Sequence, residues 1–435
     1  FVKPMEFYKH FLFFGPNLLV SEGALWKKYR KIISPSFNER NNRLVWDEVI
    51  RLAQELMDDV WENQPVMTVQ DSKDVTFPVS TCKSIKYHAE TSPAGPHGHN
   101  VCSWKDSLTP KHHKMSFQTA LRTLVAGLLH KAVFPDWMMN FTKQLRDIKL
   151  AFNEVQVYMG EMIHERRHQN LGDRHDLLSN LLHTESFGES DESLTDQEVL
   201  GNMFFLLVAG QDTTAHSLTC VFALLAIYPE EQDKLYRHIK TVITDGRLPV
   251  SLIFQEKAHV HQLQSYDDLT ALTYVHAHIR VILEAMRLYP VVPGTPRDAV
   301  KDTSIPVQGP NGEIVHIPVL EGTSLVCNFP ALHYNSSQWD DPYAFQPERF
   351  LKKWNRDAYV PFSTGPRACL GRRFAETEMI AFVTMLISRY CVDIKDDNFT
   401  AEETGKQRCA RLLKQKVLIT AGLEKVSLVF RRREE

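Results

Sequence analysis

The chain has 435 residues, and its 50 Lys and Arg residues nearly balance its 53 Asp and Glu residues. A chain of this length buries a substantial core, and the lack of a basic excess makes nucleic acid a poor candidate for a partner. The apolar fraction of 43% is close to that of globular proteins, which argues against disorder of the whole chain.

The first half of the chain predicts helices. Apolar side chains recur at helical spacing over residues 23 to 62, where Ser34 and Pro35 divide the stretch into two consecutive helices. Residues 116 to 170 show a similar pattern. Between them, residues 78 to 104 contain Pro, Gly and His without a clear period, so we expect an atypical, loop-like insertion there.

The strongest predicted helix lies between residues 193 and 229. Thr195 followed by Glu198 forms a capping-box start, and Pro229 marks the exit. Because this segment is apolar on nearly all sides, we expect a buried helix. A second atypical, loop-like insertion is predicted at residues 249 to 264.

In the last third of the chain, short predicted strands appear between the predicted helices. Residues 271 to 288 predict a helix with an apolar stripe, and residues 292 to 329 carry β-branched residues between Gly and Pro, which is typical of short strands. Residues 374 to 390 again predict a helix. The expected fold class is therefore mainly α with a small β portion (α+β).

Seven scattered cysteines favour a reducing compartment over a disulfide framework. No stretch reaches the roughly 18 uninterrupted apolar residues of a membrane-spanning helix, and the start of the chain lacks the order of a signal peptide. The first residue is Phe rather than Met, so we expect that an N-terminal segment is missing.

Residues 362 to 376, FSTGPRACLGRRFAE, place the lone Cys369 between two glycines just before a predicted helix. Backbone N–H groups and the positive end of a helix stabilise a thiolate. Gly365 and Gly371 would let the backbone approach the sulfur closely, and Phe362 would shield it from water. The pattern predicts one thiolate that binds one metal centre, whereas the alternative is a buried cysteine in a turn.

The pattern F-x-x-G-x-R-x-C-x-G is complete at Phe362, Gly365, Arg367, Cys369 and Gly371, and it resembles the haem-binding signature of the cytochrome P-450 monooxygenases. The resemblance extends in family order from about residue 5 to residue 430 and is closest to fungal members. It implies one helix-rich domain over residues 1 to 435, without the family's N-terminal anchor and first strands. It also implies haem b (iron protoporphyrin IX) with Cys369 as the axial iron ligand.

The segment AGQDTT, residues 209 to 214, places an acid and an alcohol inside an apolar helix, which is unfavourable unless they have partners. It resembles the oxygen-activation motif of the family. The resemblance implies that Thr213 hydrogen-bonds iron-bound dioxygen and that Asp212 relays protons, while Gly210 would let the helix open locally. The alternative is a Thr that bonds a helix carbonyl and an Asp that faces solvent.

Glu284 and Arg287 share one face of the 271–288 helix and can form an ion pair, which on a surface contributes only a few tenths of a kcal/mol. A surface pair is therefore one interpretation. With Arg349 of QPERF, residues 346 to 350, the two also resemble the buried Glu-Arg-Arg triad of the family. The resemblance implies a structural role, holding the cysteine loop in place.

Trp26 and Arg30, one helical turn apart, resemble the family's W-x-x-x-R motif, which binds a haem propionate. A guanidinium suits a carboxylate because it donates two parallel hydrogen bonds. The resemblance assigns Arg367 to the other propionate, with Arg297 as a further candidate. Simple packing of Trp26 against Arg30 is the alternative.

Apolar residues near these motifs are expected to face a lipophilic substrate above the haem, although packing of the helix core explains them equally well. They are Phe204, Phe205, Val208, Ala209 and Val292, followed by Pro293 and Gly294.

The resemblance implies an oxidoreductase that acts on paired donors and inserts one oxygen atom from O2 into a lipophilic compound, in fungal secondary metabolism or xenobiotic oxidation. No dinucleotide-binding fingerprint is present, so electrons would come from a separate NADPH-dependent flavoprotein reductase. Lys352, Lys353, Arg372 and Arg373 would dock this partner. Family members of this kind lie on the cytosolic face of the endoplasmic reticulum membrane.

Two other functions remain open. The two insertions depart from the family and both begin with Pro-Val-Ser, which suggests retained introns and a truncated or mis-spliced, inactive haem-binding protein. A non-catalytic metal-binding protein is the other alternative, although the spacings of its six candidate ligands fit no tight zinc pattern. Those ligands are Cys82, Cys102, His97, His99, His112 and His113. Other histidines, such as His216 and His333, are expected to be core or surface groups rather than ligands.

Overall fold

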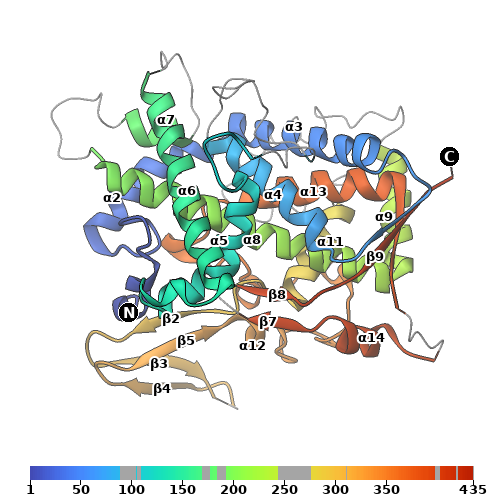
Figure 1. Cartoon of the computed structure of the whole chain (residues 1–435). Helices are drawn as coiled ribbons and strands as arrows, with labels where there is room; N and C mark the ends of the chain where they lie inside the picture. Colours follow the sequence, from blue (N-terminus) through green and yellow to red (C-terminus); the bar gives the residue numbers. More distant parts are fainter. Residues whose placement is uncertain are drawn as a thin grey trace. The chain divides into compact units, whose positions relative to one another are not determined.

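The structure is a computed structural model of the chain (Figure 1). It describes residues 1–88, 104, 109–168, 177–183, 193–242, 276–309, 311–396, 402–417 and 420–434. The chain divides into two compact units, which are described separately. The first unit comprises Phe1–Ser36, Thr109–Val208 and Val292–Phe329. The second unit comprises Phe37–Leu108, Ala209–Val291 and Pro330–Glu435.

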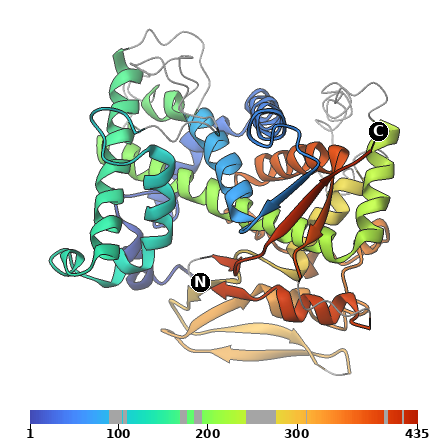
Figure 2. The same cartoon turned by 45° about the vertical axis from the view of Figure 1, so that its right-hand side comes forward.

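The first unit combines helices with two small sheets. Its α-helices are α1 (Met5–Tyr8), α2 (Gly23–Ile33), α5 (Phe117–Val133), α6 (Lys143–His168), α7 (Leu177–His183) and the beginning of α8 (Asp196–Ile227). Helices α5 and α6 pack side by side (Figures 1 and 2). Antiparallel pairing joins β2 (Gly294–Asp298) to β5 (Ser324–Asn328), and β3 (Thr303–Gln308) to β4 (Ile314–Val319). Short 3-10 turns are η1 (Lys9–Phe11), η2 (Ser34–Ser36) and η4 (Met138–Asn140).

The second unit contains the rest of α8 and most of the remaining helices. They are α3 (Glu39–Glu55), α4 (Lys73–His88), α9 (Pro229–Val242), α11 (His276–Leu288), α12 (Phe329–His333), α13 (Arg372–Arg389) and α14 (Gly405–Leu412). A π-helical turn, η3 (Leu56–Val60), follows α3, and 3-10 turns form η7 (Pro347–Leu351), η8 (Arg356–Ala358) and η9 (Gly365–Arg367).

Strands of the second unit form two antiparallel sheets. The larger sheet has the order β1 (Val66–Val69), β9 (Leu428–Arg432) and β6 (Tyr390–Ile394), and its register pairs Met67 and Val392 with Phe430. The smaller sheet pairs β7 (Gln415–Val417) with β8 (Ala421–Leu423).

Helix α13 forms the centre of the second unit. Every residue from Glu376 to Ile387 is buried, which is the pattern of a helix surrounded by other elements, and α3 packs along it (Figure 1). The buried helix fixes the position of its own first turn. The loop that carries Cys369 therefore leads directly into a firmly packed, buried helix.

Helix α8 begins as its sequence predicts. The Glu198 N–H donates to Thr195 Oγ1 at 3.3 Å, and the Thr195 N–H donates to Glu198 Oε2 at 2.8 Å, which completes a capping box. The helix ends at Ile227, and Pro229 is the first residue of α9, where its missing N–H has no cost. Within the described part of the chain, no helix combines the length and apolarity needed to cross a bilayer.

The expected elements are largely confirmed, but the first insertion is not a loop throughout. Helix α4 continues through Pro78 to His88. Val79 is fully buried, and Ser80 Oγ donates to Glu378 Oε1 at 2.5 Å. These contacts offset the cost of the backbone hydrogen bond that Pro78 cannot donate. The rest of the insertion, except residue 104, lies outside the described residues, as does the whole of 249 to 264.

Candidate active site

Cys369 lies in the loop between η9 and α13, and its side chain is exposed. Its backbone N–H donates to the Phe362 carbonyl at 3.0 Å, and the Ala368 N–H donates to the Gly365 carbonyl at 3.0 Å. Gly371 is the N-cap residue of α13. The sulfur is thus carried by a hydrogen-bonded loop close to a helix N-terminus, where a thiolate is favoured.

The two glycines of this loop do not act as expected from the sequence. A Cβ on Gly365 would meet no described atom within 4 Å, and a Cβ on Gly371 would make an ordinary contact of 3.6 Å with Phe37. Crowding by the chain itself is therefore not the reason for either glycine. Gly365 has φ of +73°, a conformation that other residues rarely adopt, so this position needs glycine for its backbone.

The thiol of Cys369 suits a cofactor that itself supplies most of the ligands of its metal. In the described ranges, no group of three or more His, Cys, Asp or Glu side chains could hold a metal ion. A single exposed thiol with open space at Gly365 would suit a haem, since a porphyrin itself binds the iron and the protein needs to add only one ligand. Most of the rival metal set lies outside the described residues, namely the side chain of Cys82 and residues 97, 99 and 102. Of the rest, His113 Nδ1 bonds Glu154 at 2.9 Å.

Thr213 and Asp212 lie in the part of α8 that belongs to the second unit. Thr213 Oγ1 donates to the Ala209 carbonyl at 2.7 Å, and Ala209, Gly210 and Thr213 share a partly exposed face. Asp212 is buried, and its Oδ2 accepts a hydrogen bond from Thr420 Oγ1. The threonine thus makes the helix bond of the alternative interpretation, but the aspartate does not face solvent.

Helix α8 is continuous through Gly210, so the expected local opening is wrong for this structure. The Thr213 hydroxyl is bound to the carbonyl one turn earlier without displacing the backbone ladder. Because its proton is directed to Ala209, the lone pairs of Oγ1 remain available to accept a hydrogen bond.

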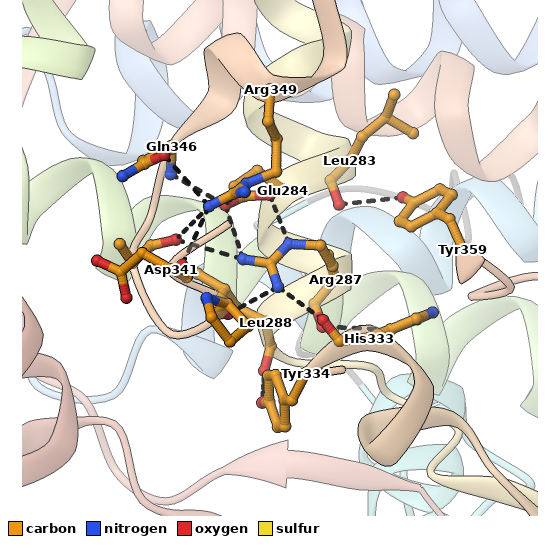
Figure 3. Close-up of polar contacts among 12 residues, drawn as sticks. Leu283, Glu284, Arg287, Leu288, His333, Tyr334, Asp341, Gln346, Arg349 and Tyr359 are labelled. Carbon is orange, nitrogen blue, oxygen red and sulfur yellow. Dashed lines mark hydrogen bonds and ion pairs between the residues drawn. The ribbon is translucent and has the colours of Figure 1, made fainter. Parts of the chain in front are cut away.

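The structure brings Glu284, Arg287 and Arg349 together in a buried network (Figure 3). Arg287 donates from Nε and Nη2 to the two Glu284 oxygens at 2.8 and 2.9 Å, and Arg349 Nε donates to Glu284 Oε1 at 2.9 Å. The remaining Arg287 N–H groups bind the carbonyls of His333, Pro342 and Ala344. A surface ion pair is therefore excluded for Glu284 and Arg287, whose side chains are fully buried.

His333 connects this network to the cysteine loop. Its Nδ1 lies 3.2 Å from the Arg287 carbonyl, and its Nε2 accepts the Val360 N–H at 3.0 Å, which assigns the proton to Nδ1. Burial lowers the pKa of His333 from 6.5 to about 4, with the Arg287 charge acting in the same direction. From Val360, backbone bonds continue through Ser363 to the turn in which the Phe362 carbonyl receives the Cys369 N–H.

The sequence analysis did not predict the partners of Asp212. His216 Nε2 lies 3.4 Å from Asp212 Oδ1, and the i, i+4 spacing of the two residues was a usable signal for this pair. Nothing local pointed to Thr420, which lies 208 residues from Asp212 in the chain. His333 is a satisfied core histidine, as expected, but its bond to Val360 depends on the folded chain path.

The candidate propionate ligands are divided between the two units. In the first unit, the Arg30 guanidinium lies 5.8 Å from the Trp26 ring centroid, and Arg297 Nη1 donates to the Pro296 carbonyl at 2.7 Å. Arg367 lies in η9 of the second unit. All four side chains are partly exposed.

The candidate substrate residues differ in exposure. Phe204 is only 4% exposed and packs against Phe14, with ring centroids 4.6 Å apart, so core packing explains it. Phe205, Val208, Ala209, Val292 and Pro293 are partly exposed. Close packing explains why position 294 is glycine, because a Cβ there would lie 2.5 Å from the Cys327 carbonyl oxygen across the β2–β5 pair.

The basic residues around the cysteine loop also differ. Lys352, Lys353 and Arg373 are exposed. Arg372 Nε donates to Glu376 at 2.9 Å, and its guanidinium lies 5.4 Å from the Phe362 ring centroid. Arg372 therefore has a structural role in the first turn of α13.

Comparisons with known proteins agree with the geometry. The family model for Cytochrome P450 matches residues 2–418. Cytochrome P450 monooxygenase 124 of Postia placenta is 41% identical over 437 residues, covering 100% of this chain and 80% of the relative. Cyclooctat-9-en-7-ol 5-monooxygenase of Streptomyces melanosporofaciens is 34% identical over 276 residues, covering 62% of this chain and 54% of the relative. The crystal structure of the cytochrome P450DA heme domain gives a TM-score of 0.72 at 22% identity, covering 99% and 83%, and confirms the expected fold.

Proposed function

Because the chain belongs to the cytochrome P450 family, whose members are haem-dependent monooxygenases, we propose that Cys369 is the thiolate that binds the haem iron. The observation that carries this assignment is the exposed sulfur on a hydrogen-bonded loop at the start of α13. Phe362, Gly365, Arg367 and Gly371 complete the loop around the cofactor. We propose Arg367 as a ligand of one haem propionate, and by family resemblance we propose Trp26, Arg30 and Arg297 as further propionate ligands.

The haem, when bound, supplies the chemistry of oxygen activation, and the protein supplies orientation, protons and exclusion of water. Thr213 would turn its hydroxyl proton, which here is directed to the Ala209 carbonyl, toward the reacting oxygen and give it up there. Asp212 would take up a proton and pass it to Thr213 Oγ1, which restores the hydroxyl. The anchored cysteine loop keeps the sulfur at a fixed position through His333 and Val360.

We propose a lipophilic small molecule as the substrate, since the residues near Thr213 that are partly exposed include Phe205, Val208 and Ala209. Electrons would come from an NADPH-dependent flavoprotein reductase, which Lys352, Lys353 and Arg373 would attract through complementary charge. We propose the cytosolic face of the endoplasmic reticulum membrane as its location, because related family members of this kind are found there.

The test is the spectrum of the purified protein after reduction and addition of carbon monoxide. We expect the long-wavelength band of thiolate-ligated haem, and we expect Cys369→Ser to abolish it. Cys391→Ser, at a partly buried cysteine in β6, is the matched control and should leave the band unchanged. An unchanged band in Cys369→Ser would contradict the assignment. A normal band without turnover in the presence of reductase and O2 would instead indicate the inactive haem-binding protein.

A further inference from the structure

Two polar side chains, His216 and Thr420, contact the buried carboxylate of Asp212. His216, one turn further along α8, places Nε2 3.4 Å from Asp212 Oδ1. Thr420, just before β8, donates to the other oxygen, Oδ2. Each carboxylate oxygen therefore has a separate partner, and both the Asp212 and His216 side chains are about one-tenth exposed.

The imidazole of His216 has little freedom to turn. A Cβ on Gly422 of β8 would lie 2.2 Å from His216 Cε1 and 2.4 Å from Nδ1, so only glycine leaves room for the ring. On α4, the Phe77 ring stands edge-on to it, with centroids 5.3 Å apart and planes at 88°. Two elements outside α8 therefore hold Nε2 toward Asp212.

The surroundings of the ring favour one of its two nitrogens as the donor. His216 Nδ1 is buried and has no hydrogen-bond partner among the described residues. A proton on Nδ1 would be a buried donor without an acceptor, which is unfavourable, whereas Nε2 lies 3.4 Å from the Asp212 carboxylate. The geometry therefore favours a proton on Nε2 over one on Nδ1.

We propose that His216 is a positioning residue for proton delivery, with Thr420 as its counterpart. The two donors hold Asp212 as an oriented carboxylate, ready to take up a proton and pass it to Thr213 Oγ1. Without the His216 N–H, one oxygen of a buried carboxylate loses its partner, and Asp212 is no longer held in this orientation. This inference rests on the proposed function, because it requires that Asp212 moves protons.

The first experiment determines the tautomer without measuring turnover. Protein labelled with 15N-histidine is studied in its reduced carbon monoxide form by long-range 15N–1H correlation, and His216→Gln assigns the signal. We expect His216 to carry its proton on Nε2. A proton on Nδ1 would overturn the proposal.

The second experiment separates positioning from stability. His216→Phe keeps a ring between Phe77 and Gly422 but removes the N–H, whereas His216→Gln keeps a side-chain N–H donor. We expect His216→Phe to lower product formation with reductase and O2 by roughly tenfold, less than the loss of a directly acting acid or base. Product formation driven by hydrogen peroxide, which brings its own protons, should stay within about twofold, and His216→Gln should restore most of the loss.

The outcomes are distinguishable. Equal losses in the two kinds of turnover, or no loss in His216→Phe, would overturn the role of His216 while the thiolate-type spectrum still supports the proposed function. A wild-type protein without that spectrum would overturn the proposed function itself. His168→Phe, on the exposed surface of α6, is the matched control and should change neither turnover.

Discussion

Two buried networks of the second unit each combine a carboxylate with a histidine, but they differ in how completely their hydrogen bonds are formed. Glu284 accepts from Arg287, Arg349 and the Gln346 N–H, and both nitrogens of His333 have partners. We call this the anchor network. By contrast, Asp212 has one contact on each oxygen, from His216 and Thr420, and His216 Nδ1 has none among the described residues. We call this the relay network.

The difference separates a structural role from a chemical one. All five N–H groups of Arg287 have acceptors, so the anchor network has no donor left for exchange and holds its loops in one arrangement. The relay network has unused hydrogen-bond capacity, because His216 Nδ1 has no partner among the described residues, and this suits the proposed role of Asp212 in proton delivery. Buried ionisable groups therefore need to be judged by their unused hydrogen-bond capacity as well as by their charge.

The largest effect is expected from breaking the anchor network. Arg287→Leu leaves the buried Glu284 with only Arg349 and the Gln346 N–H among the partners described above, and it removes one donor from each of three carbonyls. This should lower the free energy of unfolding by about 3–5 kcal/mol. Urea unfolding and the yield of haem-loaded protein measure the loss.

Arg389→Leu is the control for this change. Arg389 pairs with Asp58 at 2.8 Å, but both side chains are about two-fifths exposed, so the cost should stay below about 1 kcal/mol. Similar losses in Arg287→Leu and Arg389→Leu would show that burial does not set the value of the anchor network.

The next effect is a dependence of stability on pH through His333. Its pKa is about 4 in the folded protein and 6.5 for an unperturbed histidine, so the unfolded chain binds the proton first as the pH falls. The full contribution, about 3 kcal/mol, is present above pH 6.5 and is lost as the pH falls through 4. Urea unfolding from pH 7.5 to 4.5 measures this loss.

His333→Gln is the matched variant, because its amide can accept the Val360 N–H and does not titrate in this range. Its unfolding free energy should fall less steeply with acid than that of the wild type. Parallel pH profiles would show that other groups cause the acid sensitivity and that His333 does not link the anchor network to the cysteine loop in the way we infer.

A smaller effect is expected at Gly422, which packs against the His216 ring of the relay network. In Gly422→Ala, the new methyl group would overlap the His216 ring, and relief of the overlap should cost about 1–3 kcal/mol in unfolding free energy. Gly160→Ala is the control, since a Cβ there meets nothing within 4 Å in α6 and alanine favours a helix. Equal stability of the two variants would remove the argument that Gly422 confines His216.

Sequence reasoning predicted the parts of the fold that depend on local patterns. The break at Ser34 and Pro35, the capping box of α8 and the strands after Val292 follow from side chains within a few residues of each other. It failed at Pro78, where a local helix breaker is overcome by packing of Val79 and by the Ser80–Glu378 bond. That bond joins residues 298 positions apart.

The candidate site shows the same limit. The motif around Cys369 and the pair Asp212 and Thr213 were predicted because each lies in one short segment. The partners of Asp212 were not, because Thr420 approaches it only through the fold. Gly365 was expected to permit a tight loop, which agrees with its positive φ, but no described neighbour crowds it, because the positive φ depends on the path of the loop.

The smallest predicted effect concerns the last link between the anchor network and the sulfur. Gly365 has φ of +73° and no described atom near a Cβ position, so Gly365→Ala introduces backbone strain without overlap and should cost about 1 kcal/mol. The strain falls on the turn in which the Ala368 N–H bonds the Gly365 carbonyl. The carbon monoxide spectrum should therefore show partial loss of the thiolate-type band on mild heating, before the protein unfolds.

Gly312→Ala provides the comparison, because Gly312 also has a positive φ, +85°, but lies in the β3–β4 turn of the first unit. It should have a similar stability cost and leave the band intact up to unfolding. If both variants lose the band only when they unfold, the cysteine loop does not loosen before the rest of the protein. The anchor network would then hold the sulfur through contacts other than this turn.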